Sequence, residues 1–315
     1  MVLAVHELSV DCGPTRLVDG VSLAVEAGAT RCVVGESGSG KSITAMAVMG
    51  LLPRGVAVSG GRVLFGGRDL AGLPEQELRR IRGLEIGLVA QDPMTTLDPL
   101  VTVERQVADA VRAHDRRAGR AALRARVAEL LRSVGISGPA GRYPHEFSGG
   151  MRQRVGIAMA IANRPRLIIA DEPTTALDVT VQAQILDLLD HARAETGAAV
   201  LLITHDLGLV AERADAVTVM YAGRVVEQGS VDRVLRAPRH PYTLALLGCS
   251  PGARPADAEL IPIPGQPARP GALPAGCAFH PRCGHAREVC RTRTPSLEAG
   301  SACHFHAELE EAARG

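Results

Sequence analysis

The chain of 315 residues has no tryptophan and only seven other aromatic residues, three tyrosines and four phenylalanines. This scarcity argues against functions built on base stacking or on aromatic platforms for carbohydrates. The formal net charge is only +1, so the sequence offers no general polyanion-binding surface, and we expect no nucleic acid among the partners. With 46% apolar residues the chain can form a core, and its length suggests about two domains.

Long apolar runs are also missing. No stretch approaches about 18 consecutive apolar residues, the length that crosses a bilayer, and the first 20 residues contain Asp11, Arg16 and Asp19. We therefore expect neither a membrane span nor a secretory signal. In the reducing compartment that this implies, the seven cysteines are expected to be thiols or metal ligands instead of disulfides.

Lysine is nearly absent, since Lys41 is the only one in the chain. It lies in a segment that fits the phosphate-loop pattern GxxxxGK[ST], Gly35-Glu36-Ser37-Gly38-Ser39-Gly40-Lys41-Ser42. The glycines of such a loop let backbone N–H groups surround phosphate oxygens at a helix N-terminus, where the partial positive charge favours an anion. Lys41 would reach the β- and γ-phosphates and Ser42 would bind Mg²⁺. An expected strand at 31–34 and an expected helix at 42–52 favour this interpretation over a chance Gly/Ser turn.

Two carboxylates follow the apolar run Leu167–Ala170, which is expected to be a buried strand. Asp171 is placed to hold Mg²⁺, and Glu172 to polarise the water that attacks the γ-phosphate. A strand that ends in Asp-Glu is often only a solvated turn. Together with the phosphate loop it predicts a nucleotide hydrolase.

The remaining pattern predicts an α/β fold. Short apolar runs alternate with helical patterns and indicate a mostly parallel sheet covered by helices, with strands at 31–34, 86–90, 167–170, 200–204 and 217–221. Residues 2–10 and 61–65 are expected to form antiparallel strands beside that sheet, and residues 101–134 an inserted helical subdomain. Beyond residue 232, nine prolines between positions 238 and 274 predict a separate, loop-rich C-terminal module.

The class of nucleotide hydrolase comes from the segment 147–154, which resembles the signature sequence of ABC-type ATPases. Ser148 can cap a helix that begins at Gly149 and Gly150 and so present a second positive helix end to a γ-phosphate, although by itself it would be a simple N-cap. The other elements of that family occur in the family's order, at Gln91, at Asp171-Glu172, at Leu177-Asp178 and at Thr204-His205-Asp206.

The resemblance implies an ABC-type P-loop NTPase over residues 1–234, with a RecA-like core, an antiparallel β subdomain and a helical subdomain at about 93–150. Residues 235–315 would be the small, loop-rich C-terminal module. Two such ATPase domains would pair head to tail, so that Ser148, Gly149 and Gly150 of one cover ATP held by the other.

The same resemblance assigns roles to further residues. Gln91 would contact Mg²⁺ and the attacking water and link the site to the membrane subunits. His205 would hold the γ-phosphate and orient Glu172, and Asp178 would cross the dimer interface.

Five segments closely resemble the ATPases of dipeptide/oligopeptide importers, namely residues 91–99, 145–154, 171–179, 240–243 and 261–265. Met151 is similar to the D-type subunit, which implies an F-type ATPase as heterodimer partner. Two transmembrane permeases and an extracellular substrate-binding protein would complete the importer, with this chain peripheral on the cytoplasmic side of the cell membrane. Relatives also import nickel or sugars.

The rival class is a soluble ABC ATPase of DNA repair or translation, but the sequence has neither a long coiled-coil insertion nor a second ATPase domain.

Four cysteines in the C-terminal module are spaced C-x5-C-x6-C-x12-C, namely Cys277, Cys283, Cys290 and Cys303. Zinc ribbons usually have closer pairs, whereas iron–sulfur clusters tolerate wider spacing. By resemblance, the family's module carries this pattern and is associated with a [4Fe–4S] cluster. A zinc site completed by histidines stays an alternative, with candidates His280, His285, His304 and His306, as does a module without metal.

The sequence departs from the family at one point. ABC ATPases usually place an aromatic ring shortly after the first strand, where it stacks on adenine, and alignment puts that position near Cys12. No aromatic residue precedes Phe65. We therefore expect another group against the base and name Arg16 and Leu17 as candidates.

Overall fold

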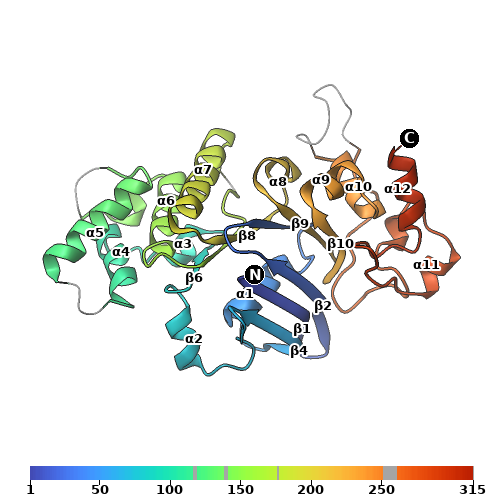
Figure 1. The fold of residues 1–315 in the computed structure, drawn as a ribbon, viewed down its shortest axis with the longest axis horizontal. Helices are drawn as coiled ribbons and strands as arrows, with labels where there is room; N and C mark the ends of the chain where they lie inside the picture. Colours follow the sequence, from blue (N-terminus) through green and yellow to red (C-terminus); the bar gives the residue numbers. More distant parts are fainter. Residues whose placement is uncertain (116–118, 138–140, 176, 251–260, 315) are drawn as a thin grey trace.

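The computed structural model of the chain describes residues 1–115, 119–137, 141–175, 177–250 and 261–314. These ranges contain two sheets (Figure 1). Their strands are β1 (Leu3–Cys12), β2 (Thr15–Val25), β3 (Thr30–Val34), β4 (Val56–Phe65), β5 (Arg68–Asp69), β6 (Ile86–Val89), β7 (Leu167–Asp171), β8 (Ala199–Thr204), β9 (Ala216–Tyr221) and β10 (Arg224–Ser230).

The larger sheet has the strand order β10-β9-β3-β8-β7-β6. Its strands β6, β7, β8, β3 and β9 run parallel, and β10 pairs antiparallel with β9. The smaller sheet, β2-β1-β4-β5, is antiparallel throughout. Both arrangements confirm the expected α/β fold, and the parallel order brings the carboxyl ends of β3, β6, β7 and β8 to one edge, where ligands of such sheets bind.

The helices cover both faces of the larger sheet (Figure 1). They are α1 (Lys41–Met49), α2 (Glu75–Ile81), α3 (Pro93–Thr96), α4 (Val103–Arg112), α5 (Arg120–Ser133), η1 (Pro144–Glu146), α6 (Gly149–Ala160), α7 (Val179–Thr196), α8 (Leu207–Arg213), α9 (Val231–Arg236), α10 (Pro241–Gly248), η3 (His280–Arg282), α11 (Glu288–Thr292) and α12 (His306–Arg314). Within the described ranges, no helix is both long enough and apolar enough to cross a bilayer.

Alternation along β7 shows how the sheet is buried on both sides. Ile168 and Ala170 belong to the core cluster that includes α6, α7 and α8, whereas Leu167 and Ile169 belong to the cluster that includes α1 and the antiparallel sheet. All four side chains are fully buried. A continuous apolar run is what a strand covered on two faces requires.

One expected boundary was wrong. The helix after the phosphate loop was expected to continue to residue 52, but α1 ends at Met49. Gly50 follows with φ of 63° in the left-handed region, where glycine carries no steric penalty and therefore ends the helix.

The C-terminal segment lies at the opposite end of the larger sheet from α4 and α5 (Figure 1). It is fastened to β10 by Glu227, whose fully buried carboxylate accepts hydrogen bonds from the backbone N–H groups of Arg239 (2.8 Å) and His240 (3.0 Å). Burial raises the pKa of Glu227. Further along the chain, Ala302 donates from its backbone to the carbonyl of Val226. The C-terminal segment therefore packs directly on β10 of the larger sheet.

Candidate functional site

The phosphate loop joins the end of β3 to the start of α1. Gly40 precedes the helix with φ of 100°, and a Cβ there would lie 3.3 Å from the carbonyl oxygen of Leu17, so both backbone shape and space favour glycine. The Lys41 ammonium donates to the carbonyls of Gly35 (2.8 Å) and Glu36 (3.0 Å). Burial lowers the pKa of Lys41. The single lysine of the chain thus lies buried inside the loop.

Asp171 ends β7 beside this loop. Its Oδ1 accepts a hydrogen bond of 3.0 Å from the hydroxyl of Ser42. Burial raises the pKa of the Asp171 carboxyl, and the neighbouring Glu172 adds to the effect. A hydroxyl and a carboxylate oxygen in contact are a donor set suited to Mg²⁺, and the bound cation would favour the ionised carboxyl.

Glu172 lies in the left-handed backbone region, with φ of 44°, which is uncommon for a residue other than glycine. Such strain persists where surrounding contacts fix it, often at functional sites. Here Oε2 accepts hydrogen bonds from Gln91 Nε2 (3.1 Å) and Thr175 Oγ1 (3.0 Å), while Oε1 lies 3.9 Å from the Lys41 ammonium. The carboxylate is therefore held at the mouth of the phosphate loop.

His205 directly follows β8 and lies near the carboxylate of Glu172. Its Nδ1 lies 3.7 Å from Glu172 Oε2, and 66% of its side chain is exposed. The next residue, Asp206, caps α8 by accepting from the backbone of Gly208 and Leu209. The cap fixes the backbone while leaving the imidazole free to turn toward a ligand.

These groups surround a cavity of about 510 Å³. Its lining consists of Leu17, residues 37–43, Gln91, Glu172, His205 and Pro270. The structure thus brings together the phosphate loop, Gln91, Glu172 and His205, with Asp171 bonded to Ser42. Pro270, from the C-terminal segment, was not foreseen, because nothing in its local sequence indicates a position beside a loop that lies far earlier in the chain.

Of the groups named for the base, Leu17 lines the cavity and is half-buried. Arg16 does not line it, and its guanidinium is hydrogen-bonded to Asp11 (2.9 Å) and Asp19 (3.1 Å). Cys12 is exposed and also lies outside the lining. The apolar side chain of Leu17 is therefore the better candidate to contact a base.

The signature residues lie elsewhere. Ser148 caps α6 by accepting from Met151 N at 3.3 Å, and Asp178 caps α7 by accepting from Val181 N at 3.0 Å. Ser148, Gly149 and Asp178 are exposed and do not line the cavity. Residue 176, within the motif 171–179, lies outside the described residues.

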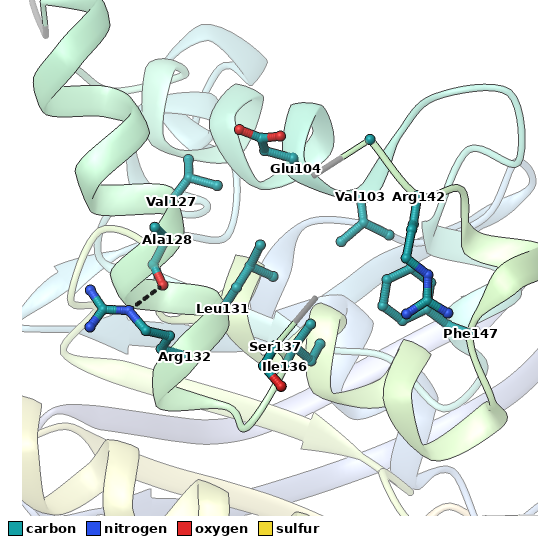
Figure 2. A pocket seen from close by; sticks show the side chains of 11 residues that line it. Val103, Glu104, Val127, Ala128, Leu131, Arg132, Ile136, Ser137, Arg142 and Phe147 are labelled. Atoms are coloured by element: carbon teal, nitrogen blue, oxygen red, sulfur yellow. Dashed lines mark hydrogen bonds between the residues drawn. The ribbon is translucent and has the colours of Figure 1, made fainter. Parts of the chain in front are cut away.

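The signature is close to a second hollow of about 330 Å³ in the helical part (Figure 2). It is lined mainly by apolar side chains of α4 and α5, and Phe147, the residue before Ser148, forms part of its wall beneath the Arg142 guanidinium, 4.2 Å from the ring centroid. None of the residues predicted from the sequence to bind nucleotide or metal lines this hollow.

The four C-terminal cysteines line one small cavity of about 20 Å³, which is also lined by His280, His285 and His304. Burial raises the pKa of three of these thiols, and in Cys303 the value is about 11, with the neighbouring thiols adding to the effect. His280, His304 and His306 each direct a ring nitrogen to a backbone carbonyl at 3.0 Å. The donor set suits iron–sulfur or zinc chemistry. Nowhere in the described part of the chain, however, are three or more His, Cys, Asp or Glu side chains already gathered as a metal site.

Two family models match the chain, one described as ABC transporter over residues 18–175 and one as oligopeptide/dipeptide transporter, C-terminal region, over residues 226–290. The chain belongs to the ABC transporter family. The first model contains the phosphate loop, the signature and the Asp171-Glu172 pair, and the second contains Cys277, Cys283 and Cys290.

Similar ABC proteins have been named. An oligopeptide transport ATP-binding protein, OppD, of Mycobacterium bovis is 53% identical over 304 residues, covering 94% of this chain but only 50% of the relative, so the chain spans half the length of that protein. The dipeptide transport ATP-binding protein DppD of Escherichia coli is 45% identical over 325 residues and covers 99% of this chain and 98% of the relative.

Among solved structures, the ATP-binding cassette MJ0796, determined as a dimer in a post-hydrolysis state with ADP and phosphate, matches with a TM-score of 0.65. The two sequences are 28% identical, and the match covers 73% of this chain and 98% of the cassette.

Proposed function

We propose that this chain is the ATP-hydrolysing subunit of an importer that takes up dipeptides or oligopeptides across the cell membrane. The observation that carries the proposal is that Lys41, Asp171 and Glu172 lie together at one phosphate loop. The C-terminal segment of the same chain matches the oligopeptide/dipeptide transporter model. The peptide substrate is supported by the names of the Mycobacterium and Escherichia relatives.

In this function the backbone N–H groups of residues 37–42 and the Lys41 ammonium bind the β- and γ-phosphates of ATP. Ser42, Asp171 and Gln91 would hold Mg²⁺, which would neutralise charge on those phosphates. Glu172 accepts a hydrogen bond from water and takes its proton as the water oxygen bonds to the γ-phosphorus. The bond from that phosphorus to the β–γ bridging oxygen breaks, and ADP and phosphate leave. His205 contacts the γ-phosphate and orients Glu172.

A second ATPase completes each site. Ser148, Gly149 and Asp178 are exposed and lie outside the cavity that holds Lys41, so they are free to face nucleotide bound to another subunit. Gly150 is buried against α7 and supports that surface. The dimeric state of the MJ0796 cassette supports such pairing. With Met151 after the two glycines, the partner is an F-type subunit in a heterodimer.

The working assembly contains two transmembrane permeases and an extracellular substrate-binding protein, with this chain peripheral on the cytoplasmic face of the membrane. Residues 1–234 form the nucleotide-binding domain, with residues 93–150 as its helical subdomain. Residues 235–315 form the C-terminal module. A [4Fe–4S] cluster bound by Cys277, Cys283, Cys290 and Cys303 stabilises that module. The alternatives, which metal analysis would distinguish, are a zinc site and a module without metal.

The proposal is tested by uptake. The chain is reconstituted in vesicles with the second ATPase, the permeases and the binding protein, and entry of a labelled dipeptide is followed with ATP on the cytoplasmic side. We expect ATP-dependent uptake that Lys41→Ala abolishes. Uptake of nickel or a sugar instead would change the assigned substrate. ATP hydrolysis without uptake of any of these solutes would favour a soluble ABC ATPase.

A further inference from the structure

The phosphate loop has a partner that lies 246 positions away in the sequence. The guanidinium of Arg282, at the end of η3, forms two parallel bonds with the Glu36 carboxylate, Nη1 to Oε2 at 2.6 Å and Nη2 to Oε1 at 2.9 Å. Only 4% of the Arg282 side chain and 24% of the Glu36 side chain are exposed. A bidentate pair of this kind is stronger and more specific in direction than a surface ion pair.

Arg282 is itself held in place from three sides. Its Nε donates to the carbonyl of Pro264 at 2.8 Å, and its guanidinium lies 5.8 Å from the ring centroid of Tyr221 and 5.9 Å from that of Phe279. Both aromatic rings are buried. The guanidinium therefore presents its two terminal nitrogens to Glu36 in a fixed orientation.

A second contact reaches the same residue of the loop. The hydroxyl oxygen of Tyr242, at the start of α10, accepts a hydrogen bond of 2.8 Å from the backbone N–H of Glu36. Tyr242 is fully buried and packs against Tyr221 and Phe279, with ring centroids 4.7 and 5.2 Å away. Three of the seven aromatic residues of the chain thus gather behind one position of the phosphate loop.

The backbone of Glu36 is also bonded to the rest of the loop. Its carbonyl accepts from the Lys41 ammonium at 3.0 Å and from the backbone of Ser39 at 3.2 Å. The residue is therefore fixed at its carboxylate, its N–H and its carbonyl at once. A loop held in this way loses less conformational freedom when it closes around phosphates, and such preorganisation increases affinity.

We propose that Arg282 and Tyr242 are positioning residues of the phosphate loop, through which the C-terminal segment sets the affinity of the site for ATP. This inference rests on the proposed function, in which ATP binds at that loop. Without Arg282, the Glu36 carboxylate would lose its counter-charge beside the phosphate site and would repel the nucleotide. Without Tyr242, the loop would lose one hydrogen bond and no charge.

The test is a double-mutant cycle on the purified full-length chain, with the affinity for a fluorescent ATP analogue in Mg²⁺ as readout. We expect Arg282→Ala to weaken binding by about tenfold or more. Glu36→Ala should weaken it less, and the double variant should bind no more weakly than Glu36→Ala alone, because the two side chains act as one unit. Arg282→Lys should recover only part of the loss, since an ammonium cannot form the two parallel bonds.

Arg287→Ala is the matched control. It removes the pair that Arg287 forms with Glu308, an exposed arginine–glutamate pair that also lies in the C-terminal segment, and it should leave affinity unchanged. If Arg282→Ala does not fold, Tyr242→Phe tests the proposal instead, with an expected severalfold loss of affinity in a variant that still folds.

Two outcomes separate this inference from the proposed function. The positioning role is refuted if Lys41→Ala abolishes binding while the Arg282 and Tyr242 variants bind as the wild type does. It is also refuted if the loss of affinity in the double variant equals the sum of the losses in Arg282→Ala and Glu36→Ala. If Lys41→Ala also binds the analogue normally, it is the proposed ATP site that fails.

Discussion

The side-chain amide of Gln91 donates a hydrogen bond of 3.1 Å to the carboxylate of Glu172, and so connects the segment after β6 to the segment after β7. Gln91 lies two residues before α3, which leads into the helical part of the chain. A shift of that part relative to the larger sheet would therefore change the hydrogen bonding of Glu172. In the proposed function, this contact lets the membrane subunits influence hydrolysis.

The first prediction concerns this carboxylate. Glu172→Gln keeps the hydrogen-bonding shape but cannot accept a proton, so hydrolysis by the assembled complex should fall by about a hundredfold or more while ATP affinity changes little. Single-turnover hydrolysis and nucleotide binding measure the two effects. The partner subunit's site must be disabled in both complexes. Hydrolysis at the wild-type rate would remove Glu172 from the mechanism.

The second prediction separates two adjacent glycines of the signature. A Cβ at Gly149 would meet Leu177 at an ordinary 3.6 Å, whereas a Cβ at Gly150 would lie 2.5 Å from Val181 Cγ1. We therefore expect Gly150→Ala to lower the free energy of unfolding by roughly 1–3 kcal/mol through overpacking, and Gly149→Ala to change it little. Chemical denaturation measures both.

Gly149→Asp extends this comparison to function. The added carboxylate would be exposed at the N-terminus of α6, so the isolated chain should bind ATP normally while the complex loses hydrolysis by repulsion of the partner's γ-phosphate. Loss of ATP binding by the isolated variant would contradict a role in another subunit's site.

Much of the site was predictable because its elements are local. The phosphate loop follows a strand and opens a helix, and Glu172 follows a buried strand, so the local sequence predicted Lys41 and Glu172 for one site. Gln91 and His205 were expected there from the resemblance to ABC-type ATPases. The sequence could not predict Arg282 against Glu36 or Pro270 in the cavity, because no pattern relates positions so far apart. Tyr242 stood in a segment that resembled the family, yet its contact with the loop became visible only in three dimensions.

The third prediction concerns the cysteine cavity. If Cys277, Cys283, Cys290 and Cys303 bind a [4Fe–4S] cluster, anaerobically purified protein should be brown and contain about four irons and four acid-labile sulfides per chain. Metal analysis by mass spectrometry and the visible absorption spectrum measure this. One zinc per chain without sulfide would establish the zinc alternative, and protein free of both metals would exclude a resident metal.

The fourth prediction concerns the base. Because Leu17 lines the cavity and an aromatic ring is missing, GTP should support hydrolysis within about tenfold of ATP. Leu17→Tyr should tighten ATP binding by adding a stacking contribution of roughly 1–3 kcal/mol. Cys12→Tyr is the control and should have little effect, since Cys12 lies outside the lining. A thousandfold preference for ATP, together with no effect of Leu17→Tyr, would show that another group recognises the base.

The pairing of Glu36 with Arg282 joins two residues that the ribosome makes at very different times. Arg282 is the 246th residue that the ribosome adds after Glu36, and at about 5–20 residues per second this takes roughly 12–50 s. Throughout that interval the nascent chain contains its lysine and its glycines but lacks the arginine that holds the loop. The positioning that we propose for the loop therefore becomes available only after residue 282 has been synthesised and has folded back onto Glu36.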